Sequence, residues 1–303
     1  MKHTKRPPRD PGTGARPRRD LIAWLIMLPS LVLFAFFVWE PLLETVRMSF
    51  YELKGVTLQN FVGFDNYIRV FKHPLFNIAW SNTIKYTVCS LVVGLVVPVI
   101  IAALITETVH WKGLFRVGVY FPNIIPGIAA MLMMGFFFRP GATGVLNILL
   151  SKLGVGPQPW LTDPQYTILW IIVAMTWKAA GSTALIYMAG ISGISPELFE
   201  AATVDGASPL RRFFSITIPS ILSLGKTMLI LQIIAVFQIL YEPLMLTNGG
   251  PDNASISVMQ LVYRFAFENF KYANAAALSV LVCIALAILT VLYFWIIKKT
   301  SDE

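Results

Sequence analysis

Six long apolar stretches constrain this chain more than any other feature of its sequence. About 20 mostly apolar residues in a helix are enough to cross the roughly 30 Å of hydrocarbon in a bilayer. The stretches that reach this length lie at 21–43, 84–106, 116–138, 166–190, 220–241 and 273–297. They predict an all-α integral membrane protein with six transmembrane helices.

The composition agrees with a membrane location. Apolar residues make up 56% of the 303 residues and charged residues only 13%, which is too little charge to cover a soluble protein of this length. The first apolar stretch follows basic residues, as in a secretory signal peptide, but it is too long and lacks a cleavage site of small residues. We therefore expect 21–43 to remain as the first transmembrane helix.

The formal charge of +8 suggests a nucleic-acid partner at first sight, but the excess is local. Residues 1–20 hold seven of the 24 Lys and Arg together with several Pro and Gly, a composition that predicts a disordered cytoplasmic tail. Such a tail either lies on anionic lipid headgroups or serves only as a topology signal. No nucleic-acid partner is expected.

Lys and Arg also predict the orientation, because they are denser in cytoplasmic loops. Three of the segments outside the apolar stretches, 44–83, 139–165 and 242–272, have a lower density of Lys and Arg than the remaining segments. The three loops are therefore expected outside, with 44–83 as a periplasmic or extracellular loop. Both termini, including a short tail at 298–303, are expected in the cytoplasm.

The loop at 195–219 has signals for two short helices. Ser195-Pro196 is a capping residue followed by proline at the first helical position, and Ser208-Pro209 repeats this pattern. Gly206 predicts a left-handed end for the first helix, and Pro219 is expected to close the second. Two capped helices suit docking into a groove of a cytoplasmic partner. The alternative is an interfacial helix that lies on lipid.

The same loop resembles the EAA loop of the permease subunits of binding-protein-dependent ABC importers. The matching residues are Glu200-Ala201-Ala202, Asp205-Gly206-Ala207, Phe213, Ile216 and Pro219, with Ile218 in place of the usual Leu. Thr247-Asn248-Gly249-Gly250-Pro251 and segments of 262–279 are similar to the MalF-like and UgpA-like permeases of the carbohydrate-uptake branch. The resemblance covers about 20–300.

The resemblance implies a type I ABC importer permease fold with a transmembrane core at 80–297. It implies four partners: a second permease subunit, a cytoplasmic ATPase dimer, an extracytoplasmic substrate-binding protein and the sugar substrate, within a bacterial or archaeal inner or plasma membrane. The loop 195–219 would act as a coupling helix on the ATPase. By resemblance, Glu200 and Asp205 would be polar anchors, with Ala201, Ala202 and Gly206 as the close-packing surface.

Polar residues inside apolar spans are costly and therefore candidates for the translocation pathway. Donors and acceptors for sugar hydroxyls, with an aromatic ring for stacking, are offered by Trp177, Lys178, Ser182, Gln232 and Gln238. The alternative reading is hydrogen bonding between helices or contact with the second permease subunit.

Other functional classes fit less well. A secondary transporter would favour acidic residues at mid-depth and paired repeats, neither of which we recognise. An intramembrane enzyme would need metal-ligand or nucleophile motifs, and ATP binding would need a Gly-x-x-x-x-Gly-Lys loop, which the sequence lacks. We therefore expect no catalytic residues, no metal and no cofactor, with ATP hydrolysis on a separate chain. Sugars, oligosaccharides, glycerol phosphates and other polyols all remain open as substrates.

Overall fold

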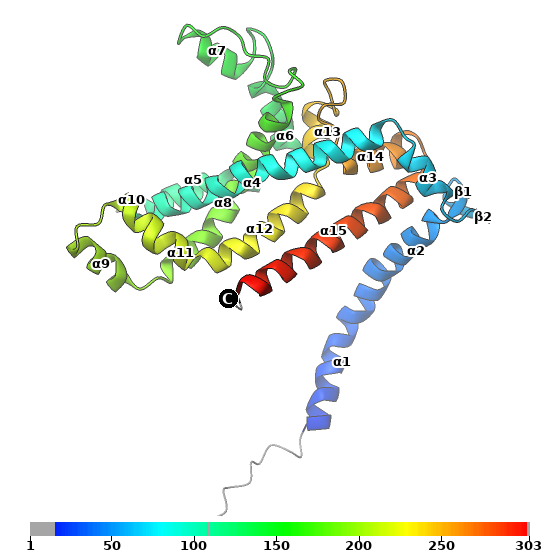
Figure 1. Ribbon diagram of the computed structural model, residues 1–303, viewed down its shortest axis with the longest axis horizontal. Coiled ribbons are helices and arrows are strands. Elements are labelled where there is room, and N and C mark those ends of the chain that lie inside the picture. Colours follow the sequence, from blue (N-terminus) through cyan, green and yellow to red (C-terminus); the bar gives the residue numbers. More distant parts are fainter. Residues whose placement is uncertain (1–15, 108–109, 302–303) are drawn as a thin grey trace, which may run out of the picture.

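The computed structural model describes residues 16–107 and 110–301, in which helices joined by loops and one short hairpin make up the fold. Four of its helices are long and apolar enough to cross a membrane. The number rises to six if each of two bent helix pairs counts as one span. In Figure 1, α4, α12 and α15 run across the molecule in similar directions.

The first span is one continuous helical rod. It comprises α1 (Arg16–Phe34), the π-helical segment η1 (Ala35–Trp39) and α2 (Glu40–Ser49). It begins at Arg16, inside the segment expected as a tail, and residues 1–15 lie outside the described part. The most apolar window of Leu21–Ser49 has no buried residue, and α1 points away from the other helices in Figure 1. This chain therefore leaves most of the first span uncovered.

The segment expected as the first outer loop is folded. Strands β1 (Tyr51–Lys54) and β2 (Thr57–Phe61) pair antiparallel, and α3 (Asp65–Phe71) follows. The buried Asn66 amide donates to the carbonyls of Ser49 at 3.0 Å and Tyr51 at 2.9 Å. These bonds fasten α3 to the end of the first span and to the start of β1.

The long helices α4 (Leu75–Glu107) and α8 (Thr167–Ser192) pack along each other, with α5 (Lys112–Ile124) against α8 and α12 (Leu222–Phe237) against α4. α4 begins nine residues before the predicted span. Gly181 brings the backbone of α8 against that of α5, because a Cβ added there would lie only 2.0 Å from the Val119 carbonyl oxygen. Glycine is therefore required for this approach.

Two of the six predicted spans are broken. The third consists of α5 and α6 (Gly127–Phe137), which meet at 100° around Ile125 and Pro126. The helix breaks at Pro126, because proline cannot donate the helical hydrogen bond. The fifth span is shorter than 220–241, since α12 ends at Phe237 and α13 (Tyr241–Leu246) starts after a gap.

The segment 139–165, drawn at the top of Figure 1, is held together by one side chain. It contains α7 (Val145–Ser151), and the buried amide of Asn147 lies at its centre. The Asn147 oxygen accepts from the Gln158 amide at 2.9 Å and from the Trp160 indole at 2.8 Å. Its nitrogen donates to the Gly141 carbonyl at 2.9 Å. The segment expected as the second outer loop is thus an ordered lobe.

The loop after α13 is fixed by polar side chains of α4. The Asn82 amide donates to the Asn253 carbonyl at 2.9 Å, and the Tyr86 hydroxyl donates to the Ser255 carbonyl at 2.9 Å. The chain continues through α14 (Val258–Tyr263), η3 (Arg264–Glu268) and α15 (Tyr272–Ser301). The Thr-Asn-Gly-Gly-Pro motif therefore belongs to a constrained loop seated on α4.

Candidate functional site

The first helix of the loop 195–219 starts where the sequence predicts. α9 (Pro196–Val204) has Ser195 at its N-cap position and Pro196 at N1. The Ser195 hydroxyl makes no capping hydrogen bond, so the prediction is right about the boundary and wrong about the side-chain bond. Glu197 lies in the first turn, where negative charge favours the helix dipole.

The end of α9 is a Schellman motif. Gly206 has φ +74°, the left-handed conformation predicted for it. Its amide donates to the Thr203 carbonyl at 3.0 Å, and the Ala207 amide donates to the Ala202 carbonyl at 2.8 Å. These two bonds satisfy carbonyls that the end of a helix leaves open and stop α9 sharply.

The surface of α9 is open. No residue of the helix is buried, and Leu198 and Val204 are 52% and 88% exposed. The five candidate coupling residues lie together along the end of α9 and its cap. Glu200, Ala201, Asp205 and Gly206 are exposed, and Ala202 is half-buried. Exposed apolar side chains on a capped helix leave a face available for a partner.

A second helical segment connects this loop to α12. It consists of α10 (Pro209–Arg212), the π-helical η2 (Phe213–Thr217) and α11 (Ile218–Ser220). The Ser208 hydroxyl accepts from the Arg211 amide at 3.3 Å, so the predicted second cap is confirmed. The segment continues one residue past Pro219 and then bends by 71° into α12.

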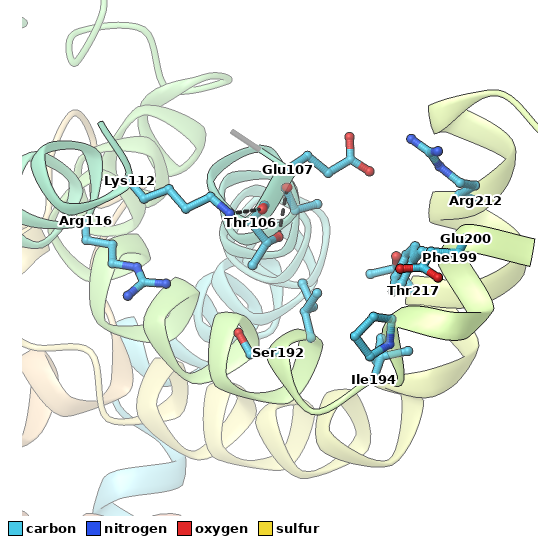
Figure 2. Close-up of a pocket in the computed structure, with 13 residues that line it drawn as sticks. Thr106, Glu107, Lys112, Arg116, Ser192, Ile194, Phe199, Glu200, Arg212 and Thr217 are labelled. Atoms are coloured by element: carbon cyan, nitrogen blue, oxygen red, sulfur yellow. Dashed lines mark hydrogen bonds between the residues drawn. The ribbon is translucent and has the colours of Figure 1, made fainter. Parts of the chain in front are cut away.

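A cavity of about 690 Å³ separates α9 from the ends of α4 and α8 (Figure 2). Figure 2 shows Lys112 and Arg116 of α5 on one side and Glu200 and Arg212 on the side of the loop. Glu107 at the end of α4 also lines it. α9 is thus held beside the membrane-crossing helices without packing tightly against them.

The predicted pathway residues lie on two elements. Trp177, Lys178 and Ser182 are in α8, where Trp177 is 36% exposed and the other two are half-buried. Gln232 is in α12, and Gln238 follows its last residue as an exposed side chain. None of the five lines the cavity of Figure 2.

Gln232 has a specific place between three helices. A Cβ added to Gly94 of α4 would lie 2.5 Å from the Gln232 amide nitrogen and 3.7 Å from the hydroxyl oxygen of Thr176 in α8. Thr176 is buried, and its hydroxyl has no hydrogen-bond partner within the described chain. The glycine makes room for a polar contact region where α4, α8 and α12 meet.

Glu242 is a buried acid that the sequence reasoning missed. It is 5% exposed in α13, and its Oε2 has no hydrogen-bond partner in the described residues. The charge of Lys178 in α8 acts on it. In the sequence Glu242 directly follows an apolar stretch and looks like an exposed span end. The break at Gln238–Leu240 instead turns it into the protein.

The fold and this site define a class of protein: a helical membrane protein with several spans and an exposed, capped helical loop between two of them. The chain belongs to the family of binding-protein-dependent transport system inner membrane components, whose model matches residues 94–300. It is thus a permease subunit of an ABC transporter and an inner membrane protein. Its relatives are transport subunits and not enzymes.

Curated relatives match almost the whole chain. A protein of Bacillus subtilis named as a probable ABC transporter permease, YurN, is 32% identical over 94% of this chain and 99% of its own length. The trehalose/maltose permease MalF of Thermococcus litoralis is 30% identical, covering 94% and 96%. The lactose permease LacF of Rhizobium radiobacter is 28% identical, covering 92% and 95%.

A solved structure has the same fold. A chain of a bacterial ABC transporter that imports the acidic polysaccharide alginate matches with a TM-score of 0.81 and 25% identity, over 93% of this chain and 96% of that chain. The same type of transporter in complex with an alginate-bound periplasmic protein matches with a TM-score of 0.79 and 25% identity, over 91% and 93%. The predicted type I importer permease fold therefore has a close structural counterpart.

Proposed function

We propose that this chain is a permease subunit of an ATP-driven importer for a sugar or oligosaccharide and forms half of the translocation pathway. The names of relatives support this class, because they include permeases for lactose and for trehalose/maltose. A polyol phosphate is the second candidate, since UgpA, a glycerol-3-phosphate permease, is 28% identical over 92% of the chain. The bent helix pairs count as spans in this proposal, which gives six spans and cytoplasmic termini.

The observation that carries the proposal is the exposed, capped helix α9. Its Schellman end and the capped start of α10 hold it in one orientation, so it can transmit a displacement that a flexible loop would absorb. We assign Glu200 and Asp205 as polar anchors on a cytoplasmic ATPase dimer, with Ala201, Ala202 and Gly206 as the slim contact surface. A second permease subunit would complete the pathway, and an extracytoplasmic binding protein would deliver the substrate.

Cross-linking from α9 tests the docking directly. Val204 is 88% exposed at the end of α9, and Val56 is 70% exposed in the hairpin near the other end of the first span. Val204→Cys, labelled with a photoactivatable benzophenone in a variant without Cys89 and Cys283, should form an adduct with the co-expressed ATPase. Val56→Cys should form none, because the hairpin would lie outside the membrane. Equal labelling from both positions would contradict the assignment.

The pathway residues carry a prediction of their own. Lys178 is half-buried in α8, with Glu242 and Thr176 as nearby buried polar groups. We assign Trp177, Lys178, Ser182, Gln232 and Gln238 to the pathway. Lys178→Met should raise the KM for uptake about ten-fold, because it removes a hydrogen-bond donor to the substrate.

The uptake assay uses the co-expressed complex in vesicles with radiolabelled lactose, trehalose and glycerol 3-phosphate, and KM is measured for whichever is imported. Lys226→Met is the matched control, because Lys226 is also half-buried but lies near the start of α12. It should leave KM unchanged. An unchanged KM for Lys178→Met would remove Lys178 from the pathway.

A further inference from the structure

A hydrogen bond joins the two helices of the loop across their turn. Arg212 of α10 donates from Nη1 to the Thr203 hydroxyl of α9 at 2.7 Å. That hydroxyl donates its own hydrogen to the Phe199 carbonyl at 2.7 Å, which leaves its lone pairs available to the guanidinium. The bond is short and has a charged donor, and it lies at the exposed surface of the loop.

This bond is the polar side-chain connection between α9 and the rest of the described chain. Within the described residues, no other side-chain hydrogen bond or ion pair joins α9 to another element. The cavity of Figure 2 lies between α9 and the ends of α4 and α8. A force applied to α9 therefore has two routes into the protein, the backbone at each end of the helix and the Arg212–Thr203 bond.

Arg212 is well placed to carry that force. It is the last residue of α10, and the helical segment continues from it through η2 and α11 to the bend before α12. Its Nε is buried and has no hydrogen-bond partner in the described part of the chain, so the guanidinium is partly desolvated. The bond to Thr203 holds this partly desolvated group in one direction.

We propose that Arg212 and Thr203 are positioning residues that lock α9 onto the segment α10–α11, so that a displacement of α9 moves the fifth span. The inference rests on the proposed function, in which α9 docks on the ATPase. The cavity permits α9 and α10 to shift together relative to α4 and α8, because no tight packing opposes that shift. Arg212 acts through α9 and does not itself contact the substrate.

Two matched pairs of variants isolate the bond. Thr203→Val removes the hydroxyl with little change of volume, and Thr203→Ser keeps it. Arg212→Ala removes the donor, and Arg211→Ala removes a neighbouring exposed cation whose side chain makes no hydrogen bond in the described structure. All four are made in the complete complex with its ATPase, and the amount of assembled complex is measured for each.

The first measurement is a spin-label distance. Labels at Leu198→Cys in α9 and Phe214→Cys in η2 occupy side chains that are 52% and 61% exposed, in a variant without the native cysteines. We expect a narrow distance distribution that is unchanged when MgATP and vanadate trap the complex. Thr203→Val and Arg212→Ala should broaden it, whereas Thr203→Ser and Arg211→Ala should not.

The second measurement is the number of substrate molecules imported per ATP hydrolysed. Thr203→Val and Arg212→Ala should lower this ratio about ten-fold at equal assembly, because a bond with a charged donor is lost. Thr203→Ser should keep the ratio of the unchanged protein, because it keeps the hydroxyl. If Thr203→Val behaves as Thr203→Ser in both measurements while a Gly206 variant uncouples transport, the bond is not the connection although α9 is the coupling helix. If α9 gives no cross-link to the ATPase, the proposed function itself fails.

Discussion

Replacing Gly206 by valine should strongly reduce coupled transport. Gly206 has φ +74°, and a Cβ there would meet no atom of this chain within 4 Å, so within the chain the cost arises from the backbone conformation. A β-branched residue in this region costs about 1–3 kcal/mol, which strains the Schellman end of α9. We expect uptake to fall about ten-fold or more, since 1.4 kcal/mol corresponds to a factor of ten. Vesicle uptake and ATPase rates of the assembled complex measure this.

Two controls make the result specific. Gly206→Asn should lower uptake less than Gly206→Val does, because asparagine tolerates the left-handed conformation although it also adds a side chain to the contact surface. Gly113→Val introduces the same side chain in α5, at a glycine that also has open space around it but an ordinary helical backbone. It should leave uptake near the level of the unchanged protein. Full activity of Gly206→Val would show that the orientation of α9 does not matter for coupling.

Replacing Gly181 by alanine should have the largest effect on stability. The added Cβ would lie 2.0 Å from the Val119 carbonyl oxygen and 2.9 Å from the Tyr120 Cα, so the backbones of α5 and α8 must separate. Overpacking against a side chain costs about 1–3 kcal/mol, and a backbone cannot turn aside as a side chain can. We expect a loss of about 3 kcal/mol and a fall of roughly 5–10 °C in the melting temperature.

Fluorescence-detected size-exclusion chromatography after heating measures that shift in detergent. The matched control is Gly118→Ala, next to Val119 on α5, where a Cβ meets no atom within 4 Å. Alanine favours a helix more than glycine does, so Gly118→Ala should be neutral or slightly stabilising. Equal melting temperatures for the two variants would mean that α5 and α8 do not approach each other as closely as the structure has them.

The sequence predicts the local features of this protein well. The apolar stretches locate the long helices, and Ser195-Pro196 and Gly206 locate both ends of α9, because capping depends on residues that are neighbours in the chain. Boundaries are less accurate where tertiary contacts extend a helix, as at the start of α4. Pro98 and Pro122 lie within continuous helices whereas Pro126 lies at a break of 100°, a difference that the sequence does not show.

The partners of the polar residues inside the spans were not predictable in the same way. Gln232 was assigned to the pathway from its residue type, and the structure places it beside Gly94 and Thr176. Glu242 looks like an exposed span end in the sequence, yet it is 5% exposed. The sequence carried no signal for either contact, because the partners come from helices far apart in the chain.

By itself the sequence determined that this is a membrane protein of long apolar helices, with a capped loop whose residues identify its family. The tertiary structure decided which faces of those helices meet, how Gly181 and Gly94 permit close approach, and that Arg212 reaches Thr203. The physical reason is the spacing of apolar residues along each helix. A soluble helix shows its buried face as an apolar stripe, but a membrane helix is apolar on every side and its pattern does not distinguish lipid from protein.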